Sequence, residues 1–264
     1  MKNIVFYFSG TGNCLKVAKS ISGELENCEV VSMGKRFVGK QFKLTDQYDS
    51  IGFIYPTYFW GLPKIVIEFV EKLELENNKD AYYYSVTTYG GAAGNAVYQI
   101  CELLLKKHGV KLNYGQKLKM FSNYVVNYDM NRNVDEITKK SNEELVPIVN
   151  SIKKKENNKV GKWTRIFDFV NKNFIGKVSD MDKDFRVNNN CTGCGICKKV
   201  CPVNNIEMAN NRPQYKRHCE QCVACIQYCP ERAINYKNAT EKRRRYTHPE
   251  ISYQELFDYN NKRY

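Results

Sequence analysis

The chain has 264 residues, a length that allows one large domain or two domains of modest size. Lys and Arg outnumber Asp and Glu by 41 to 28, and nearly all of the resulting net charge of +13 lies in residues 151–264. Basic runs stand at 153–155, 198–199, 216–217 and 242–245, and although most such runs are only solvated surface, a charge distribution this uneven favours an acidic partner. No run approaches the roughly 18 consecutive apolar residues of a membrane span, so we expect a cytoplasmic protein that does not cross a membrane.

The first 155 residues alternate between apolar runs and helical patterns. Residues 2–8 form an apolar run typical of a strand buried on both faces of a parallel sheet, and apolar residues follow it at helical spacing. Repeats of this pattern predict strands near Val30 and at 50–55 and 81–87, helices at 62–75 and 92–107, a fifth strand within 119–126 and a last helix over 142–155. The order of these elements predicts an α/β fold with a doubly wound parallel sheet.

The loop after the first predicted strand has the composition of a phosphate site. Its hydroxyls, glycines and N–H groups precede a helix, and it consists of Ser9, Gly10, Thr11, Gly12, Asn13 and Cys14. A nucleoside triphosphatase is disfavoured because Asn13 stands where a P-loop has lysine. A nicotinamide site fits less well because Leu15 replaces the third glycine of the Gly-x-Gly-x-x-Gly pattern.

Two further loops, after the third and fourth predicted strands, are rich in aromatic residues and glycines. The first contains Pro56, Thr57, Tyr58, Phe59, Trp60 and Gly61, and the second contains Thr88, Tyr89, Gly90 and Gly91. Ligands of doubly wound sheets bind beyond the carboxyl ends of the strands, and aromatic rings beside a phosphate loop favour a planar ligand. Taken singly, each of these aromatic residues could equally belong to the core.

Eight of the 11 cysteines repeat one spacing in the last third of the chain. Each run reads Cys-x2-Cys-x2-Cys-x3-Cys-Pro, with its cysteines at Cys191, Cys194, Cys197 and Cys201 or at Cys219, Cys222, Cys225 and Cys229. The spacing predicts two [4Fe–4S] clusters, because one short loop supplies three of the four thiolates that a cubane needs. Zinc is disfavoured because a tetrahedral site has no use for the third cysteine, and disulfides because the amino terminus does not resemble a signal peptide.

The fourth ligand of each cluster must come from outside its short loop. In the bacterial two-cluster arrangement, the last cysteine of each run binds the cluster of the other run. One cluster would then be bound by Cys191, Cys194, Cys197 and Cys229, and the other by Cys219, Cys222, Cys225 and Cys201. A proline follows the last cysteine of each run and fixes the direction of the chain there.

The three loops together resemble those of a known family. Residues 9–13 resemble the FMN phosphate loop of flavodoxins, and residues 55–63 and 87–91 resemble the two loops that enclose the isoalloxazine ring. With the cysteine runs, the chain resembles flavodoxin–ferredoxin fusion proteins of anaerobes over residues 2–155 and 183–252. The resemblance implies a flavodoxin-like sheet, then a small α+β two-cluster ferredoxin-like domain, with FMN and two [4Fe–4S] clusters as cofactors. Cys14 departs from the family, which commonly has Thr or Ser there, and a thiol is a weaker donor to phosphate.

We expect a flavodoxin-like domain over 1–156, a linker over 157–182, a ferredoxin domain over 183–238 and an extension over 239–264. An amphipathic helix in the linker is indicated by the spacing of Trp163, Ile166, Phe167, Val170 and Phe174. This helix could lie on a membrane surface, but packing against one of the two domains fits better because it would hold flavin and clusters close together. The extension offers Tyr246, Ile251, Tyr253 and Leu256 for docking, and its sequence points to no chemistry.

The predicted cofactors point to electron transfer. FMN accepts electrons singly or in pairs and each cluster carries one, so we expect the protein to pass electrons between FMN, two clusters and external redox partners. Trp60 and Tyr89 are the expected flavin neighbours, and no catalytic acid–base set is visible in the sequence. The alternative is an FMN-dependent reductase of a small molecule, such as a quinone or nitro compound, supplied by its own clusters. A nucleic-acid-binding protein would use the basic runs but leaves the aromatic loops unexplained.

Overall fold

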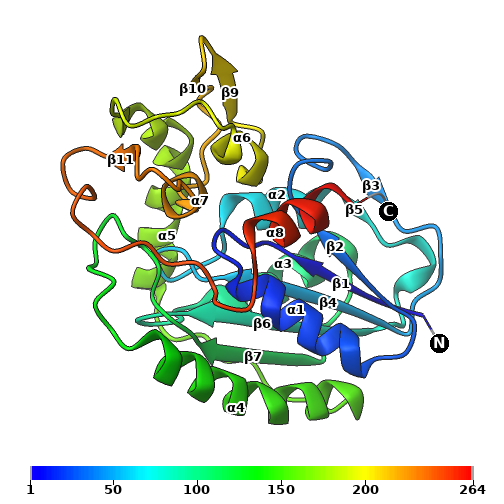
Figure 1. The fold of residues 1–264 in the computed structure, drawn as a ribbon. Helices are drawn as coiled ribbons and strands as arrows, with labels where there is room; N and C mark the ends of the chain where they lie inside the picture. The colour runs from blue at the N-terminus through cyan, green and yellow to red at the C-terminus, as the bar shows by residue number, and fades with distance from the viewer. Residues whose placement is uncertain (1, 263–264) are drawn as a thin grey trace.

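The computed structural model describes residues 2–262, and its centre is a sheet of five parallel strands (Figure 1). The strand order is β2-β1-β4-β6-β7. The strands are β1 (Asn3–Tyr7), β2 (Cys28–Ser32), β4 (Ser50–Pro56), β6 (Tyr82–Tyr89) and β7 (Tyr114–Lys119). Every neighbouring pair is parallel, so the predicted doubly wound α/β sheet is confirmed.

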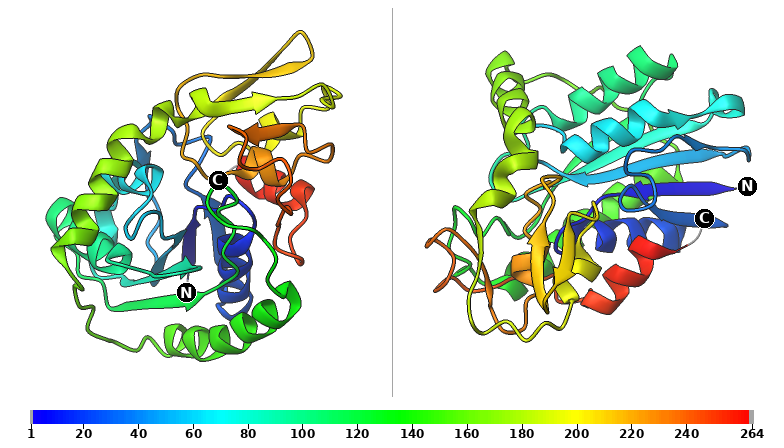
Figure 2. Two further views of the ribbon diagram at one scale, coloured as in Figure 1. Left: turned by 90° about the vertical axis from the view of Figure 1, so that its left-hand side faces the viewer. Right: turned by 90° about the horizontal axis from the view of Figure 1, so that it is seen from above.

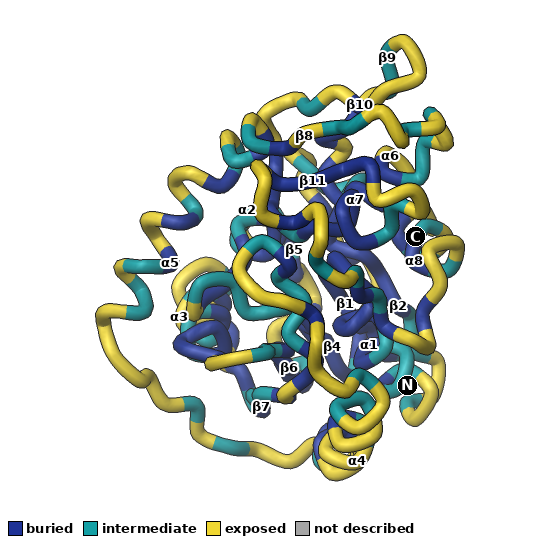
Figure 3. The backbone as a smooth tube through the Cα atoms, turned by 60° about the vertical axis from the view of Figure 1, so that its left-hand side comes forward, coloured by how far each residue is buried: buried dark blue, intermediate teal, exposed yellow. Residues whose placement is uncertain are grey.

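Helices cover both faces of the sheet, as strands that are apolar along their whole length require. Contacts between helices place α1 (Asn13–Glu24) with α4 (Val134–Lys153), and α2 (Lys64–Lys72) with α3 (Ala96–His108). Successive side chains of β1 enter opposite cores: Phe6 packs with Phe69 of α2, whereas Tyr7 joins Leu15 of α1. The central strands are accordingly dark along their length in Figure 3, where buried residues are dark blue.

The predicted position of the fifth strand was wrong. β7 pairs with β6 from Tyr114 to Lys119 and ends where the prediction within 119–126 began. The apolar residues that favoured 119–126, such as Phe121 and Val125, are buried in the loop that follows the strand rather than in the sheet. This loop runs to Asn133, which caps α4 by accepting a hydrogen bond from the Glu136 amide, so that helix starts before the predicted 142.

The chain beyond α4 forms a long helix, a small unit with short strands, and a final helix. α5 (Arg165–Val178) leads into β8 (Phe185–Val187), α6 (Ile196–Val200), β9 (Ile206–Ala209), β10 (Arg212–Tyr215), α7 (Ala224–Gln227), β11 (Ile234–Tyr236) and α8 (Tyr253–Asn261). β9 pairs with β10 and β8 with β11, both antiparallel. Minor elements are β3 (Phe42–Lys43), β5 (Leu73–Glu74) and single 3-10 turns at Glu76–Asn78 and Ser179–Asp184.

Both α5 and α8 pack against the α/β sheet unit. The buried Asn171 of α5 donates to the carbonyls of Tyr58 and Leu62, which fixes the helix beside the loop after β4. α8 lies along β2 (Figure 2). Its Asn260 accepts hydrogen bonds from Tyr7 and Ser32 at 2.9 Å each. α8 is therefore part of the first structural unit. No helix within residues 2–262 has the length and apolar composition needed to cross a membrane.

Candidate cofactor sites

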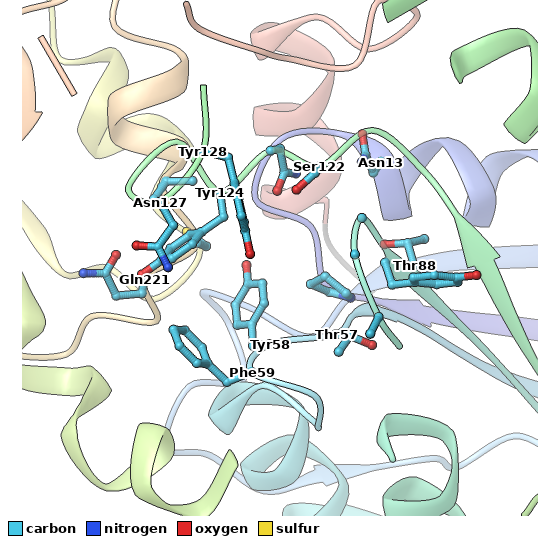
Figure 4. Close-up of a pocket in the computed structure, with 18 of the residues that line it drawn as sticks. Asn13, Thr57, Tyr58, Phe59, Thr88, Ser122, Tyr124, Asn127, Tyr128 and Gln221 are labelled. Carbon is cyan, nitrogen blue, oxygen red and sulfur yellow. The ribbon is translucent and has the colours of Figure 1, made fainter. Parts of the chain in front are cut away.

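A cavity of about 300 Å³ opens at the carboxyl ends of β4, β6 and β7 (Figure 4). Its volume lies within the range of small-molecule sites, roughly 300–1,000 Å³. We call it the flavin pocket, after the ligand that the sequence predicts for these loops. Its walls come from the loops after β1, β4, β6 and β7, from α5 and from the second cysteine run, and they include Asn13, Pro56, Thr57, Tyr58, Phe59, Trp60, Thr88, Tyr89, Gly90, Gly91, Phe121, Ser122, Asn123, Tyr124, Asn127, Tyr128, Phe174, Gln221, Cys222 and Val223.

The aromatic wall of the pocket is built on a strained turn. Tyr58 and Gly61 exchange two main-chain hydrogen bonds, of 2.9 and 3.1 Å, around Phe59 and Trp60. Phe59 and Trp60 have φ angles of 45° and 64°, values that cost a non-glycine residue about 1–3 kcal/mol. The neighbouring structure holds this conformation: the Phe59 ring stacks on Phe174 at 4.2 Å, and the Asn171 amide binds the Tyr58 carbonyl. The turn therefore presents a fixed aromatic surface to the pocket.

Most of the predicted flavin residues line the pocket, but most residues of the first loop do not. From the loop after β4 all predicted residues except Gly61 line the cavity, and from the loop after β6 all four do. From the first loop only Asn13 lines it. Its other five members, Ser9, Gly10, Thr11, Gly12 and Cys14, are buried beneath other segments. Their role toward a phosphate stays a prediction.

Local hydrogen bonds explain how the first loop is folded. The Ser9 hydroxyl accepts from the Gly12 amide at 3.1 Å, and Gly12 adopts a φ of 99° at the start of α1. Cys14 turns its thiol into the core, where the sulfur lies 3.1 Å from the Thr88 hydroxyl. Burial raises the pKa of this thiol to about 12, so it is protonated at neutral pH. The sulfur contacts Thr88 at the end of β6.

Sequence reasoning missed the contribution of residues 120–128. This loop supplies Phe121, Ser122, Asn123, Tyr124, Asn127 and Tyr128 to the pocket. The available signal was its position after the last parallel strand, since the carboxyl ends of all these strands meet at one edge of the sheet. Placing a strand at 119–126 concealed that signal. The contributions of Phe174 and Gln221 depend on the docking of distant segments.

A segment of the extension lies across the first loop, and we call residues 240–251 the strap. The main-chain amide of His248 donates to the Thr11 carbonyl at 2.8 Å, and the Tyr246 hydroxyl donates to the Asn13 side chain at 2.9 Å. The Tyr246 ring also stacks on Phe121 at 4.3 Å. The strap therefore joins the first loop of the pocket to the loop after β7.

Two arginines of the basic run at 242–245 are structural. Arg243 donates to the carbonyls of Val125 and Val126 at 2.7 and 2.6 Å, and Arg245 donates to the Thr240 and Ile234 carbonyls. Both arginines are half-buried, so their guanidinium groups have partners within the chain and remain partly open to solvent. Contact between these two arginines and an acidic partner therefore stays a prediction.

His248 gives the strap a dependence on pH. Burial lowers the pKa of this imidazole to about 4, with Glu250 opposing the shift and Lys16 adding to it. An unfolded histidine titrates near 6.5, so the folded form loses stability as pH falls from about 6.5 toward 4. We expect the free energy of unfolding to fall by about 1 kcal/mol more between pH 7.5 and 5.5 in the wild type than in His248→Gln. Denaturant titrations at both pH values measure this difference, and parallel curves for the two proteins would contradict it.

The eight cysteines line two small cavities, and each cavity combines both runs. One cavity is lined by Cys191, Cys194, Cys197 and Cys229, and we call it the outer cavity. The inner cavity is lined by Cys201, Cys219, Cys222 and Cys225. In each case, three cysteines of one run meet the last cysteine of the other. Residues 2–262 contain no group of three or more His, Cys, Asp or Glu side chains arranged to hold a metal ion.

Main-chain amides point at the cysteine sulfurs. Amides of Asn205, Gln221 and Ala233 donate to the sulfurs of Cys201, Cys219 and Cys229 at 3.2–3.3 Å. Burial raises the pKa of Cys197 to about 11 and that of Cys222 to about 12. The other three cysteines of the outer cavity also raise the pKa of Cys197, and Cys201 of the inner cavity also raises the pKa of Cys222. Each cavity thus brings four thiols close together.

The two cavities differ in their exposure to solvent. Cys194 of the outer cavity is exposed, whereas Cys201, Cys219 and Cys225 of the inner cavity are buried. The inner cavity faces the α/β unit. Two glycines of that unit, Gly10 and Gly34, allow the cysteine loops to approach its main chain closely. A Cβ atom on Gly10 would lie 2.4 Å from the Cys222 carbonyl oxygen, and one on Gly34 would lie 2.6 Å from that of Pro202. The cysteine loops therefore dock directly on the loops after β1 and β2.

The flavin pocket and the inner cavity have a wall in common. Cys222 and Val223 line both. Glu220, in the same loop, reaches α2 and accepts a hydrogen bond from the Ile65 amide at 3.1 Å. Burial raises the pKa of Glu220 to about 8. The second cysteine run thus contacts the first loop, the pocket and α2.

Two family models match the chain. A flavodoxin domain matches residues 4–108, and a 4Fe-4S dicluster domain matches residues 183–230. No curated protein matches the chain.

Several solved structures resemble the chain at low identity. A flavodoxin from the domain Archaea is 16% identical with a TM-score of 0.38, covering 58% of this chain and 99% of that one. A flavoprotein in complex with FMN from Lactobacillus acidophilus NCFM is 16% identical with a TM-score of 0.36, covering 44% of this chain and 92% of that one. Rubredoxin oxygen:oxidoreductase from the anaerobe Desulfovibrio gigas is 13% identical with a TM-score of 0.38, covering 58% of this chain and 36% of that one.

The sheet order and the two family matches define the class of the protein. It joins a flavodoxin domain to a 4Fe-4S domain in one polypeptide. The chain is a fusion of a flavodoxin domain and a 4Fe-4S dicluster domain.

Proposed function

We propose that the chain transfers electrons between FMN in the flavin pocket, a [4Fe–4S] cluster in each cysteine cavity and external redox partners. The observation that best supports this proposal is the shared wall formed by Cys222 and Val223. A cofactor in the pocket and one in the inner cavity would lie against the same residues. The predicted domain limits, 1–156, 157–182, 183–238 and 239–264, are part of the proposal.

The cysteine cavities suit iron–sulfur clusters in their donor set. Each cavity is lined by four cysteines and by no histidine. Each lining also contains one carboxylate, Glu231 in the outer cavity and Glu220 in the inner cavity. Glu220 is held by the Ile65 amide instead. Burial raises the pKa of Cys197 and Cys222, so a cationic group must be present before four thiolates can share one cavity. Amides aimed at three of the sulfurs would stabilise their negative charge.

The flavin pocket suits a planar ring with a polar edge. Tyr58, Phe59, Trp60 and Tyr89 supply aromatic walls, and both polar atoms of the buried Gln221 amide lack a partner within residues 2–262. We assign the phosphate of FMN to the first loop, Ser9–Cys14, where Asn13 reaches the pocket. When bound, a flavin exchanges electrons singly or in pairs and each cluster exchanges one.

The chain arranges its sites in a sequence from the interior to the surface. The pocket adjoins the inner cavity, three of whose four cysteines are buried, and the outer cavity has the exposed Cys194. We infer that external proteins exchange electrons at the outer cavity. Lys198 and Lys199, which follow Cys197 on α6, are exposed there and fit an acidic partner.

The charge of this face can be tested through the rate of electron exchange. With an acidic redox protein as partner, Lys198→Glu with Lys199→Glu should slow the second-order rate about tenfold at low salt and remove most of its salt dependence. Stopped-flow mixing between about 0.02 and 0.2 M salt measures both effects. The matched control reverses Lys139 and Lys140 of α4, far along the chain from the cysteine runs. If both pairs of reversals change the rate equally, the proposal that external proteins exchange electrons at the outer cavity is contradicted.

A second candidate is the reduction of a small molecule at the flavin pocket. It is favoured by the exposure of Tyr128 and Trp60, 53% and 38%, because both side chains line the pocket and reach solvent. A quinone or nitro compound could then approach the ring directly. Turnover of such a compound with the purified protein and a one-electron donor would distinguish this reductase from a carrier.

Cofactor analysis of protein purified without oxygen tests the proposal. Two four-iron clusters and one flavin predict about eight irons, about eight acid-labile sulfides and one non-covalent FMN per chain. Iron, sulfide and zinc assays, with chromatography of the released flavin, give these numbers. Stoichiometric zinc without sulfide would reject the cluster assignment, and release of FAD in place of FMN would reject the assignment of the first loop.

A further inference from the structure

Gln221 lies where the second cysteine run meets the flavin pocket. It stands between Glu220 and Cys222, lines the pocket, and is only 1% exposed (Figure 4). Its φ angle of 51° is unusual for a residue other than glycine. Its main-chain amide donates to the Cys219 sulfur at 3.2 Å, so the residue is fixed to the inner cavity by its backbone. The side chain is thus positioned by the cysteine loop.

The amide of this side chain has no partner. Neither its oxygen nor its nitrogen is hydrogen-bonded within residues 2–262, although both atoms are buried. Gln227, six residues further, shows the usual outcome: its nitrogen donates to the Asn123 carbonyl at 2.7 Å and its oxygen accepts from the Tyr246 amide at 2.8 Å. A buried amide without partners is costly and rare in folded proteins. An unpaired amide on the wall of a pocket therefore indicates a ligand with a complementary edge.

We propose that the Gln221 side chain binds the polar edge of the flavin ring, an inference that rests on the proposed FMN site. That edge consists of an N–H group, N3, flanked by two carbonyl oxygens, O2 and O4. A primary amide offers one acceptor and one donor in a single plane, and this pair matches N3–H and an adjacent carbonyl with two parallel hydrogen bonds. No side chain of the flavodoxin sheet would be needed for this contact.

The assignment gives the cysteine loop a role in positioning the flavin. Gln221 precedes Cys222, whose carbonyl lies against Gly10 and whose side chain lines both the pocket and the inner cavity. One short segment would therefore set the position of the ring and of an inner-cavity ligand together. Displacing that segment should affect both sites.

Binding of FMN and of its N3-methyl analogue tests the inference. Gln221→Met keeps the length of the side chain and removes both hydrogen bonds, so we expect FMN to bind about five- to fiftyfold more weakly than to the wild type. Gln214→Met, an exposed glutamine of β10, is the matched control and should bind FMN as the wild type does. Fluorescence titration of protein with its clusters intact measures the affinities.

The analogue separates a direct contact from an indirect effect. Methylation of N3 removes the N–H group from which the Gln221 oxygen would accept a hydrogen bond. It should therefore weaken binding to the wild type by about the same factor as Gln221→Met weakens FMN binding, and it should have little effect on binding to Gln221→Met. An equal penalty for methylation in both proteins, or unchanged FMN affinity in Gln221→Met, would overturn the inference and leave the FMN site in place. A wild-type protein that binds no FMN would overturn the proposed function itself. If Gln221→Met fails to retain its clusters, Gln221→Leu, which also lacks both the donor and the acceptor, takes its place with the same criteria.

Discussion

Replacing Cys201 with alanine is expected to remove the cluster of the inner cavity, although Cys201 belongs to the first cysteine run. The reason is geometric, because Cys201 shares that cavity with Cys219, Cys222 and Cys225. A cubane with three thiolates is labile, so the iron content should fall to about half. Flavin binding should be weakened rather than lost, because most of the pocket is lined by the loops of the sheet and only Gln221, Cys222 and Val223 come from the second cysteine run.

Double variants make the ligand assignment decisive. Cys201→Ala with Cys219→Ala should lose no more iron than Cys201→Ala alone, since both residues would bind one cluster. Cys201→Ala with Cys194→Ala should lose nearly all iron, since these two cysteines line different cavities although they stand in the same run. Iron and sulfide assays on anaerobic protein measure this. The opposite pattern would show that each run holds its own cluster.

Replacing Gly10 with alanine is expected to disrupt the docking of the second cysteine run on the first loop. The added methyl group would lie 2.4 Å from the Cys222 carbonyl oxygen, and a main-chain carbonyl cannot move aside as a flexible side chain can. Overpacking of this kind costs about 1–3 kcal/mol. FMN affinity should fall as well, because Cys222 and Gln221 line the pocket.

Gly23 provides a matched control for this substitution. It lies in α1, and a Cβ atom built there meets no atom within 4 Å. Gly23→Ala should leave FMN affinity unchanged and stabilise the helix by up to about 1 kcal/mol. Denaturant unfolding and FMN titration of both variants provide the comparison. Equal stability and equal affinity in Gly10→Ala and Gly23→Ala would contradict the close approach of the two loops.

Local patterns predicted most of the sheet because burial on both faces leaves a continuous apolar run. β1 and β4 were recognised in this way. β7 was not, since its sequence from Tyr114 to Lys119 contains Gln116 and two lysines and only two of its residues are buried. An edge strand needs no continuous apolar run, so periodicity pointed to the next apolar segment along the chain.

The cysteine spacing and the crossed arrangement of bacterial two-cluster proteins gave the same two groups of cysteines that line the cavities, and their role as cluster ligands stays a prediction. The aromatic loops after β4 and β6 could also be predicted from local sequence, because each follows a strand directly. Gln221 and the strap could not, because their positions depend on how the ferredoxin unit and the extension dock on the sheet. Arg243 shows the same limit: its sequence neighbours are basic, while its partners, Val125 and Val126, lie over 100 residues away.

Flash photoreduction of the bound flavin, followed by the visible absorbance of the clusters, tests the central claim that the pocket and the inner cavity form one electron-transfer unit. The shared wall at Cys222 predicts that cluster reduction follows flavin reduction at a rate independent of protein concentration. Cys194→Ala, which alters only the outer cavity, should retain this fast phase, and Cys201→Ala should lose it. A rate proportional to protein concentration in the wild type would mean that electrons pass between molecules, and would contradict the account.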